Sequence, residues 1–348
     1  MNFDLDDDQR DLASAAGDFL ASAASPARAR KVLDGAPAEE VGPGRDGWVS
    51  SGFATVTVPE AAGGGGGTLV DLAVVAEQAG RVLAGPSLVS YARAAVLLAD
   101  LPEPLAALAG GALRVAVVDD PRAVLDALGA DTFLLLRGDD LVLASGTATP
   151  ATPIDPTRGL APVDLGTGEV VLPGARDRWD RARQVARVIL AAEDLGAAAR
   201  AVELGVAYAK ERTAFGRAIG SYQAVKHALV DAYVRVEQLR SLVWWAAWAA
   251  DDAPDELPLA SAAAKGAAAV TLEQAADTLV HVHGGVGFTW EHDAHLYWRR
   301  AAVDRLLIGD DVGAFDEVAR LATAGDVPDV PDAPAGSPDE LAARGVAR

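Results

Sequence analysis

Two glycine-containing segments in the C-terminal half carry side chains that can bind an anion. The first runs from Lys210 to His227 and reads KERTAFGRAIGSYQAVKH, with Arg212 and Arg217 on either side of a glycine. An arginine beside a helix N-terminus suits a diphosphate, because its guanidinium fork and the free backbone N–H groups both face the anion. We expect Gly216 to end one helix and Ser221 to cap the next. A plain helix break with solvated arginines is the alternative interpretation.

The second segment runs from His281 to His295 and reads HVHGGVGFTWEHDAH. Three glycines in four positions let a backbone approach a ligand closely. The four histidines raise the question of a metal. However, His281 and His283 are two residues apart and cannot share a helix face, although His292 and His295 can. The segment also lacks a pattern such as H-E-x-x-H, so we expect no metal site.

Composition narrows the possible partners and compartment. The chain has 348 residues, enough for two or three domains, and a formal net charge of −20 at pH 7. Nucleic-acid binding requires a basic face, so this charge argues against a nucleic-acid partner. The absence of cysteine excludes disulfides and thiolate chemistry. The acidic start lacks an apolar core, and no long apolar run occurs. We therefore expect a cytoplasmic protein without a membrane span.

The segments around the two loops are mostly helical in pattern. Apolar residues recur at helical spacing in three N-terminal segments, which are residues 4–35, 69–84 and 87–100. Residues 36–68 are rich in Gly and Pro and predict little regular structure. From Trp179 to about Thr323 the pattern is helical again, with helices expected at 258–282 and 291–308. Long helices with short links indicate an antiparallel bundle.

Short segments rich in branched residues separate the two helical parts. They are residues 113–118, 132–136, 141–144 and 169–172, and they predict the strands of a small β domain. The expected class is α+β and mostly α. The expected domains are an N-terminal helical domain at 1–105, a small middle β domain at 106–176 and a C-terminal helical bundle at 177–324. The acidic, proline-containing segment 325–348 is predicted to be a disordered tail.

At these two loops the sequence resembles the acyl-CoA dehydrogenase family, and the likeness extends from residue 1 to about residue 322. The family pattern R-x-x-F-G-x-x-I-G-x-x-Q is matched by Arg212, Phe215, Gly216, Ile219, Gly220 and Gln223. The pattern Q-x-x-G-G-x-G-[FY] is matched by Gly284, Gly285, Gly287 and Phe288, with His281 in place of the glutamine. The resemblance implies an N-terminal helical domain, a middle β domain and a C-terminal four-helix bundle. It also implies FAD bound between subunits.

The resemblance assigns cofactor contacts residue by residue. Arg212 and Phe215 are expected at the FAD diphosphate and adenine region, and Gln223 on the same arm of the cofactor. His281, Gly284 and Gly285 are expected against the ADP part of a flavin held mainly by the partner subunit. Histidine can still donate or accept one hydrogen bond there.

The sequence departs from the family at the catalytic base. The family's reaction removes a proton from Cα of an acyl thioester while hydride leaves Cβ for flavin N5, and a carboxylate must accept the proton. The usual base precedes a glycine in this part of the chain, but here Ile308 precedes the glycine. An alternative family position falls near Ala186, which is not acidic either. Glu193 and Asp310 are candidates for a displaced base, although helix capping or solvation is the interpretation we prefer for both.

The middle segment departs as well. The T-E-P-x-x-G-S-D-like stretch that family members use around the flavin ring is not recognisable, and residues 119–131 hold only Asp119, Asp120 and Pro121 in its place. The resemblance therefore gives no residues in this segment for contacts with the flavin ring or with acyl-CoA.

Three hypotheses follow from these departures. In the first, the chain is a self-sufficient homo-oligomeric acyl-CoA dehydrogenase with a displaced carboxylate. In the second, it resembles the short, base-lacking partner subunit of certain heteromeric actinobacterial enzymes of sterol and related acyl-CoA breakdown, and pairs with a second dehydrogenase-like chain. A non-enzymatic helical scaffold is the third, but it leaves the intact Arg212–Gln223 loop unexplained. The expected partners are an acyl-CoA substrate, that second chain or a copy of this one, and an electron-transfer acceptor protein.

Overall fold

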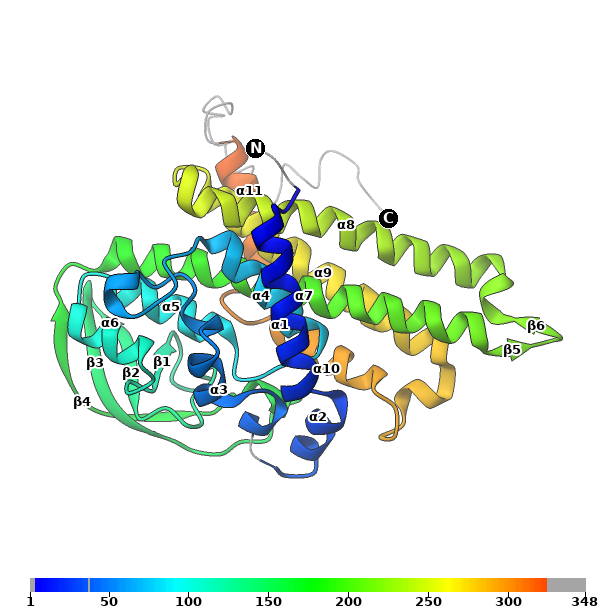
Figure 1. The fold of residues 1–348 in the computed structure, drawn as a ribbon, viewed down its shortest axis with the longest axis horizontal. Helices are drawn as coiled ribbons and strands as arrows, with labels where there is room; N and C mark the ends of the chain where they lie inside the picture. The colour runs from blue at the N-terminus through cyan, green and yellow to red at the C-terminus, as the bar shows by residue number, and fades with distance from the viewer. Residues whose placement is uncertain (1–3, 37, 324–348) are drawn as a thin grey trace, which may run out of the picture.

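The N-terminal part consists of helices that pack across the bundle. The computed structural model describes residues 4–36 and 38–323, so the predicted tail at 325–348 lies outside the described residues. The helices are α1 (Asp7–Ala23), α2 (Pro26–Leu33), α3 (Gly44–Ser50), α4 (Leu69–Arg81), α5 (Leu88–Leu98) and α6 (Pro102–Ala109). Capping boxes begin two of them: Asp6 with Gln9 starts α1, and Thr68 with Asp71 starts α4. Figure 1 shows α1 lying across α4 and α7.

Two N-terminal predictions need correction. The helix expected over residues 4–35 is two helices, because Ser25 caps a new helix and Pro26 occupies its first turn, where proline is tolerated. The segment 36–68 was expected to have little regular structure, yet it holds α3 and three short 3₁₀ helices, which are η1 (Ala38–Val41), η2 (Phe53–Thr55) and η3 (Glu60–Ala62). Fully buried Trp48 anchors α3, and its indole N–H donates to the carbonyl oxygen of Pro86. Tertiary packing thus overrides the local Gly and Pro signal.

A small sheet forms one end of the molecule. Its strands are β1 (Val115–Val118), β2 (Thr132–Arg137), β3 (Asp140–Ala148) and β4 (Val163–Leu172), in that spatial order. Strand β2 pairs with β1 in parallel and with β3 antiparallel, and β4 pairs antiparallel with β3. All four predicted strands are present, although β3 and β4 are longer than predicted. A 3₁₀ turn, η4 (Pro156–Arg158), lies between those two strands.

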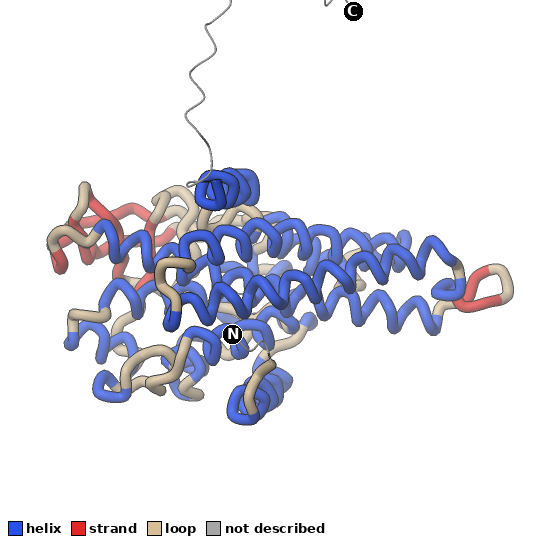
Figure 2. Tube along the Cα trace, turned by 90° about the horizontal axis from the view of Figure 1, so that it is seen from above, coloured by secondary structure: helices blue, strands red, loops and turns tan. Residues whose placement is uncertain are grey.

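Long helices form the rest of the molecule and confirm the mostly α, α+β class. They are α7 (Arg176–Glu211), α8 (Gln223–Asp252) and α9 (Leu257–His283), followed by the shorter α10 (Ala294–Asp304) and α11 (Asp311–Thr323), which pack on α9. The helix predicted over 291–308 is therefore shorter, because the chain turns after Asp304. Figure 2 shows the sheet at one end and a small hairpin at the opposite end of the long helices.

The helical parts meet where α4 crosses α7. An ideal Cβ built on Gly80 would lie 1.8 Å from the carbonyl oxygen of Glu193, and one built on Gly196 would lie 1.8 Å from that of Glu77. Only glycine permits such close approach of two backbones. This crossing fixes the start of α5 against the middle of α7. Within the described residues, no helix is long and apolar enough to cross a membrane.

Candidate cofactor loops and a cavity at the base position

The segment with Arg212 forms a hairpin at the far end of the bundle. Helix α7 ends at Glu211 and α8 begins at Gln223, with Tyr222 as its N-cap. The expectation that Gly216 ends the first helix and Ser221 caps the second is therefore wrong. Instead, β5 (Thr213–Ala214) and β6 (Arg217–Ala218) pair across a two-residue turn. Both turn residues, Phe215 and Gly216, have positive φ, which is typical of a type I′ hairpin turn.

Ring stacking joins the two glycine-containing segments. Tyr208, near the end of α7, stacks on His283 at a centroid distance of 4.0 Å, and His283 lies 4.2 Å from His292. His283 also donates from Nδ1 to the carbonyl oxygen of Leu279. The stack places the chain just before Arg212 beside the chain just before Gly284. The structure therefore brings together the two sets of residues that the sequence singled out.

The paired loops present an open surface. Arg212, Gln223, His281, Gly284 and Gly285 are all exposed, and Phe215 is 97% exposed. In the described part of the chain, the Arg212 side chain has no hydrogen-bond or ion-pair partner. A Cβ added to either of the two glycines would meet no atom within 4 Å. An unpaired guanidinium beside bare backbone fits the diphosphate and adenine arm of a dinucleotide.

Three of the four histidines in the second segment, His283, His292 and His295, contact neighbouring side chains or backbone. Burial, followed by the charges of His283 and His295, lowers the pKa of His292, and its Nδ1 accepts from the backbone N–H of Ala294. Burial, with Arg299 nearby, also lowers the pKa of His295. Among the residues described, no group of three or more His, Cys, Asp or Glu side chains is arranged to hold a metal ion.

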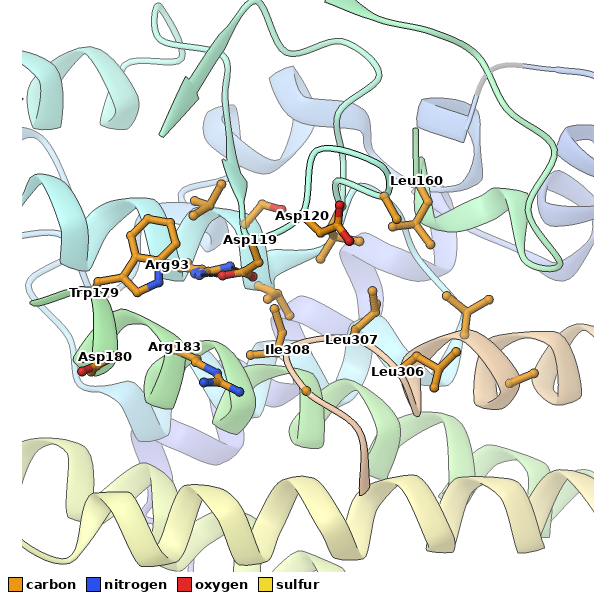
Figure 3. A pocket seen from close by; sticks show the side chains of 18 of the residues that line it. Arg93, Asp119, Asp120, Leu160, Trp179, Asp180, Arg183, Leu306, Leu307 and Ile308 are labelled. Atoms are coloured by element: carbon orange, nitrogen blue, oxygen red, sulfur yellow. Dashed lines mark hydrogen bonds and ion pairs between the residues drawn. The ribbon is translucent and has the colours of Figure 1, made fainter. Parts of the chain in front are cut away.

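The base position lies on a cavity of about 650 Å³ between the sheet and the bundle. Ile308 and Gly309 form part of its wall, in the turn after α10. Figure 3 shows the opposing side chains: Arg93 from α5, Asp119 and Asp120 after β1, and Trp179 and Arg183 from the start of α7. Sequence reasoning identified position 308 but missed Arg93, Trp179 and Arg183, because these arginines and this tryptophan belong to no local motif.

Two cations fix the turn that carries Ile308. Arg187 Nε donates to the Ile308 carbonyl oxygen at 3.3 Å. Lys265 Nζ, fully buried, donates to the carbonyl oxygens of Asp304 and Arg305 at 3.0 and 3.1 Å. Ile308 itself has φ 57°, an unusual conformation for a β-branched residue. The turn therefore holds position 308 in the cavity wall even though isoleucine carries no proton-accepting group.

Two of the three carboxylates that line the cavity, Asp119 and Asp120, are already paired with arginines. Both Asp119 oxygens accept from Arg93 at 2.5 Å, and the Arg93 guanidinium also lies over the Trp179 ring at 4.7 Å. Asp120 accepts from Arg122, and this hydrogen bond lowers the pKa of Asp120 to about 2. A carboxylate with so low a pKa accepts a proton poorly at neutral pH.

The other candidate bases lie away from the cavity wall. Glu193 is buried and accepts from Arg158 Nη1 at 2.5 Å, the Ser87 hydroxyl at 2.8 Å and the Leu88 backbone N–H at 3.0 Å. Asp310 is exposed and accepts from the Gly313 backbone N–H at 2.7 Å, at the start of α11. Ala186 is fully buried. The structure brings none of these three residues to the lining of the cavity beside Ile308.

The structure defines a three-part class of protein, in which N-terminal helices and a small sheet pack on a bundle of long helices. Family profiles match twice: the acyl-CoA dehydrogenase N-terminal domain over residues 6–101, and the acyl-CoA dehydrogenase C-terminal domain over residues 181–321. Acyl-CoA dehydrogenase IpdE2 of Mycobacterium tuberculosis is 38% identical over 257 residues, which cover 72% of this chain and 77% of that protein.

Solved structures share the fold. One chain of the ChsE4-ChsE5 complex from Mycobacterium tuberculosis matches with a TM-score of 0.81 and 23% identity, covering 94% of this chain and all of that one. The FAD complex of PigA matches with a TM-score of 0.79 and 20% identity, covering 93% of this chain and all of that one. The chain belongs to the acyl-CoA dehydrogenase family, and it is a short member with actinobacterial relatives. It is an oxidoreductase of that family, whose cofactor is FAD.

Proposed function

We propose that this chain is the FAD-binding, base-lacking subunit of a heteromeric acyl-CoA dehydrogenase. The observation that carries the proposal is Ile308, which the turn after α10 holds in the cavity wall where the family's carboxylate belongs. FAD, when bound, accepts the hydride in the family's desaturation of an acyl-CoA thioester. The part of this chain is then to hold the cofactor's diphosphate and adenine arm, with Arg212 as the charged donor and Gly284 and Gly285 as the bare backbone.

The contacts of Asp119 and Glu193 also support a role without the catalytic base for this chain. A base must stand free to take a proton from Cα. Asp119 is engaged on both oxygens by Arg93, and Glu193 accepts hydrogen bonds from three donors. The partner chain therefore supplies the base, and an electron-transfer protein takes up the electrons from the reduced flavin. The cytoplasmic location inferred from the sequence stays a prediction.

A self-sufficient homo-oligomer is the second candidate function, and one observation favours it. Asp119, Asp120 and Asp180 line the cavity beside Ile308, so carboxylates are present near the base position. The pKa of about 2 at Asp120 and the bidentate ion pair at Asp119 count against a base role for these two residues.

Co-purification decides between the two candidates. The tagged chain is purified from its native host, and mass spectrometry and an absorbance scan identify the accompanying chain and the flavin content. We expect a second dehydrogenase-like chain of similar size and one FAD for each pair of chains. The chain purified alone should bind FAD weakly and show no flavin reduction by acyl-CoA at rates usual for the family. A homo-oligomer with one FAD per chain, rapidly reduced by acyl-CoA, contradicts the proposal.

Substitution of Arg212 tests the cofactor assignment in the same assembly. Arg212→Ala removes a charged donor to the diphosphate, and hydrogen bonds to charged groups contribute about 1.5–3 kcal/mol. We therefore expect FAD affinity to fall by about tenfold or more, measured as flavin retained after dialysis. Arg10→Ala on α1 is the matched control, because this arginine pairs with nearby Asp7, and the variant should retain flavin. Equal flavin content in the two variants would remove Arg212 from the site.

A further inference from the structure

The cavity beside Ile308 has the size of a small-molecule site. Its volume of about 650 Å³ lies within the usual range of ligand pockets, roughly 300–1,000 Å³. Under the proposed function this cavity no longer carries the base of the reaction, so its lining can serve another ligand. The inference rests on that proposed function in this respect.

Most of the cavity wall is apolar. Strand β1, the end of η4, helix α7 and the turn after α10 all contribute, through Val117, Leu160, Trp179, Leu306, Leu307 and Ile308. Leu306 is 67% exposed, which places an apolar side chain at the open side. Burial of an apolar ligand body against such a wall is favourable by about 25 cal/mol for each Å² removed from water. The wall therefore suits a hydrocarbon body rather than a polar one.

Three arginines line the cavity, and two of them are paired with carboxylates. Arg93 pairs with Asp119, and Arg176 pairs with Asp139 and donates to the Gly138 carbonyl oxygen. In the part of the chain that the structure describes, the Arg183 side chain has no hydrogen bond or ion pair. Its Nη2 would lie 3.0 Å from a Cβ built on Gly309, so the guanidinium reaches the turn that carries Ile308.

Arg183 is exposed to solvent, and the carboxylates that act on it are engaged elsewhere. Partial burial, followed by the charge of Arg187, lowers the pKa of Arg183, while Asp119 and Glu317 act in the opposite direction. Both of these carboxylates already pair with other arginines, namely Arg93 and Arg187. A guanidinium without an ion-pair partner can bind a carboxylate that presents two oxygens to its fork.

We propose that this cavity binds a free monocarboxylic acid with an apolar body, whose carboxylate pairs with Arg183 while its hydrocarbon part lies against Trp179 and Leu307. The ligand should carry a single negative charge. Asp119, Asp120 and Asp180 also line the cavity and would repel a polyanion. This occupant differs from a CoA thioester in bringing its own carboxylate and no phosphates. The site would let the chain carry the free acid at the end of α7 opposite the candidate cofactor loops.

Calorimetric titration with octanoate tests the proposal on the full chain. Octanoate should bind with a 1:1 stoichiometry, and Arg183→Leu should weaken octanoate binding by at least tenfold. Octanol, which has the same body without the charge, should bind the wild-type chain and Arg183→Leu equally. Arg176→Leu is the matched control, because that arginine lines the same cavity but is already paired, and it should bind octanoate like the wild-type chain.

Two further measurements keep the outcome decisive. Arg183→Lys retains the charge and should recover part of the octanoate affinity, and circular dichroism establishes that each variant is folded. Absence of octanoate binding up to millimolar concentration, or equal affinity of the wild-type chain and Arg183→Leu, overturns the proposal. Flavin content per pair of chains is independent of Arg183, so failure here leaves the subunit assignment standing. Conversely, one reducible FAD per chain of a homo-oligomer removes the subunit assignment whatever octanoate does.

Discussion

A buried network of charged side chains connects η4, α7, α9 and α10. Arg158 forms ion pairs with Glu193 and with Asp304, and all three side chains are almost fully buried. Asp194 is 1% exposed, and within the described residues neither of its carboxylate oxygens accepts a hydrogen bond. Burial, together with the neighbouring charge of Asp304, raises the pKa of Asp194 well above its ordinary value. We therefore expect the folded protein to favour the protonated, neutral form of Asp194.

This proton makes the stability of the protein depend on pH. The folded pKa of Asp194 is raised above the unfolded value, so the folded state binds the extra proton. The resulting stabilisation is complete below about pH 4 and is lost as pH rises toward the folded pKa, with a slope of up to about 1.4 kcal/mol per pH unit.

Asp194→Asn, which mimics the neutral acid, should abolish that part of the pH dependence and raise the free energy of unfolding at neutral pH. Urea denaturation between pH 5 and pH 8 measures both effects. An unchanged pH slope in the variant would mean that Asp194 is ionised in the folded protein.

Single residues set the limit of what the sequence predicts. The sequence alone shows that residue 308 stands at the family's base position, because a local motif, the following Gly309, marks that position. The role of Glu193 does not follow, because its partner Arg158 is remote in sequence and only tertiary folding pairs them. Arg183 is unremarkable in the sequence for the same reason: its value as a free cation depends on the arginines around it having other partners.

At the scale of elements, the contact between α4 and α7 depends on two glycines. Gly80 and Gly196 each place a helix backbone where a side chain would overlap the facing carbonyl group. The contact also fixes where Glu193 meets Ser87 at the start of α5. The position of the buried charge network therefore depends on how closely these two helices approach.

Gly196→Ala should destabilise the protein strongly. The added methyl group would lie 1.8 Å from the carbonyl oxygen of Glu77, and overpacking against the backbone costs about 3 kcal/mol or more. Gly17→Ala on α1 is the matched control, since its nearest atom would be 3.8 Å away. That variant should gain about 0.5–1 kcal/mol, because alanine favours a helix interior. Thermal unfolding measures both, and similar melting temperatures for the two variants would contradict the account.

Elements with a strong local pattern were predicted well. The strands and the long helices follow from the spacing of their apolar residues, many of which are buried. The breaks were harder. Pro26 divides a helix whose pattern runs through it, and the hairpin after Glu211 is set by the positive φ values of Phe215 and Gly216 rather than by a glycine helix stop. Helix α3 was missed because its one large buried anchor, Trp48, lies among glycines and a proline.

At the scale of the whole molecule, exposed aromatic side chains gather in the two cofactor loops. Phe215 is 97% exposed, Phe288 81% and Trp290 60%. Large exposed aromatics are typical of the central residues of protein interfaces. They flank Arg212 and Gly284, so a partner chain that covers them would also cover a bound cofactor.

Phe215→Asp should prevent the two chains from assembling while the protein stays folded. A charge at the centre of an apolar contact weakens association by about tenfold or more. Co-expression followed by size-exclusion chromatography with light scattering measures the assembled fraction. Val170→Asp on β4, an exposed apolar position in the sheet at the opposite end, is the control and should assemble normally. Normal assembly of Phe215→Asp would place the interface elsewhere.

The single long helix α7 connects the cavity beside Ile308 with the candidate cofactor loops. Arg183 stands beside the cavity near its start, and Arg212 follows directly after its end. At about 1.5 Å per residue, the 29 residue steps from Arg183 to Arg212 span about 43 Å. The two ends of α7 are consequently too far apart for a side chain at one end to contact residues at the other. A substitution at position 308 therefore need not disturb the residues around Arg212.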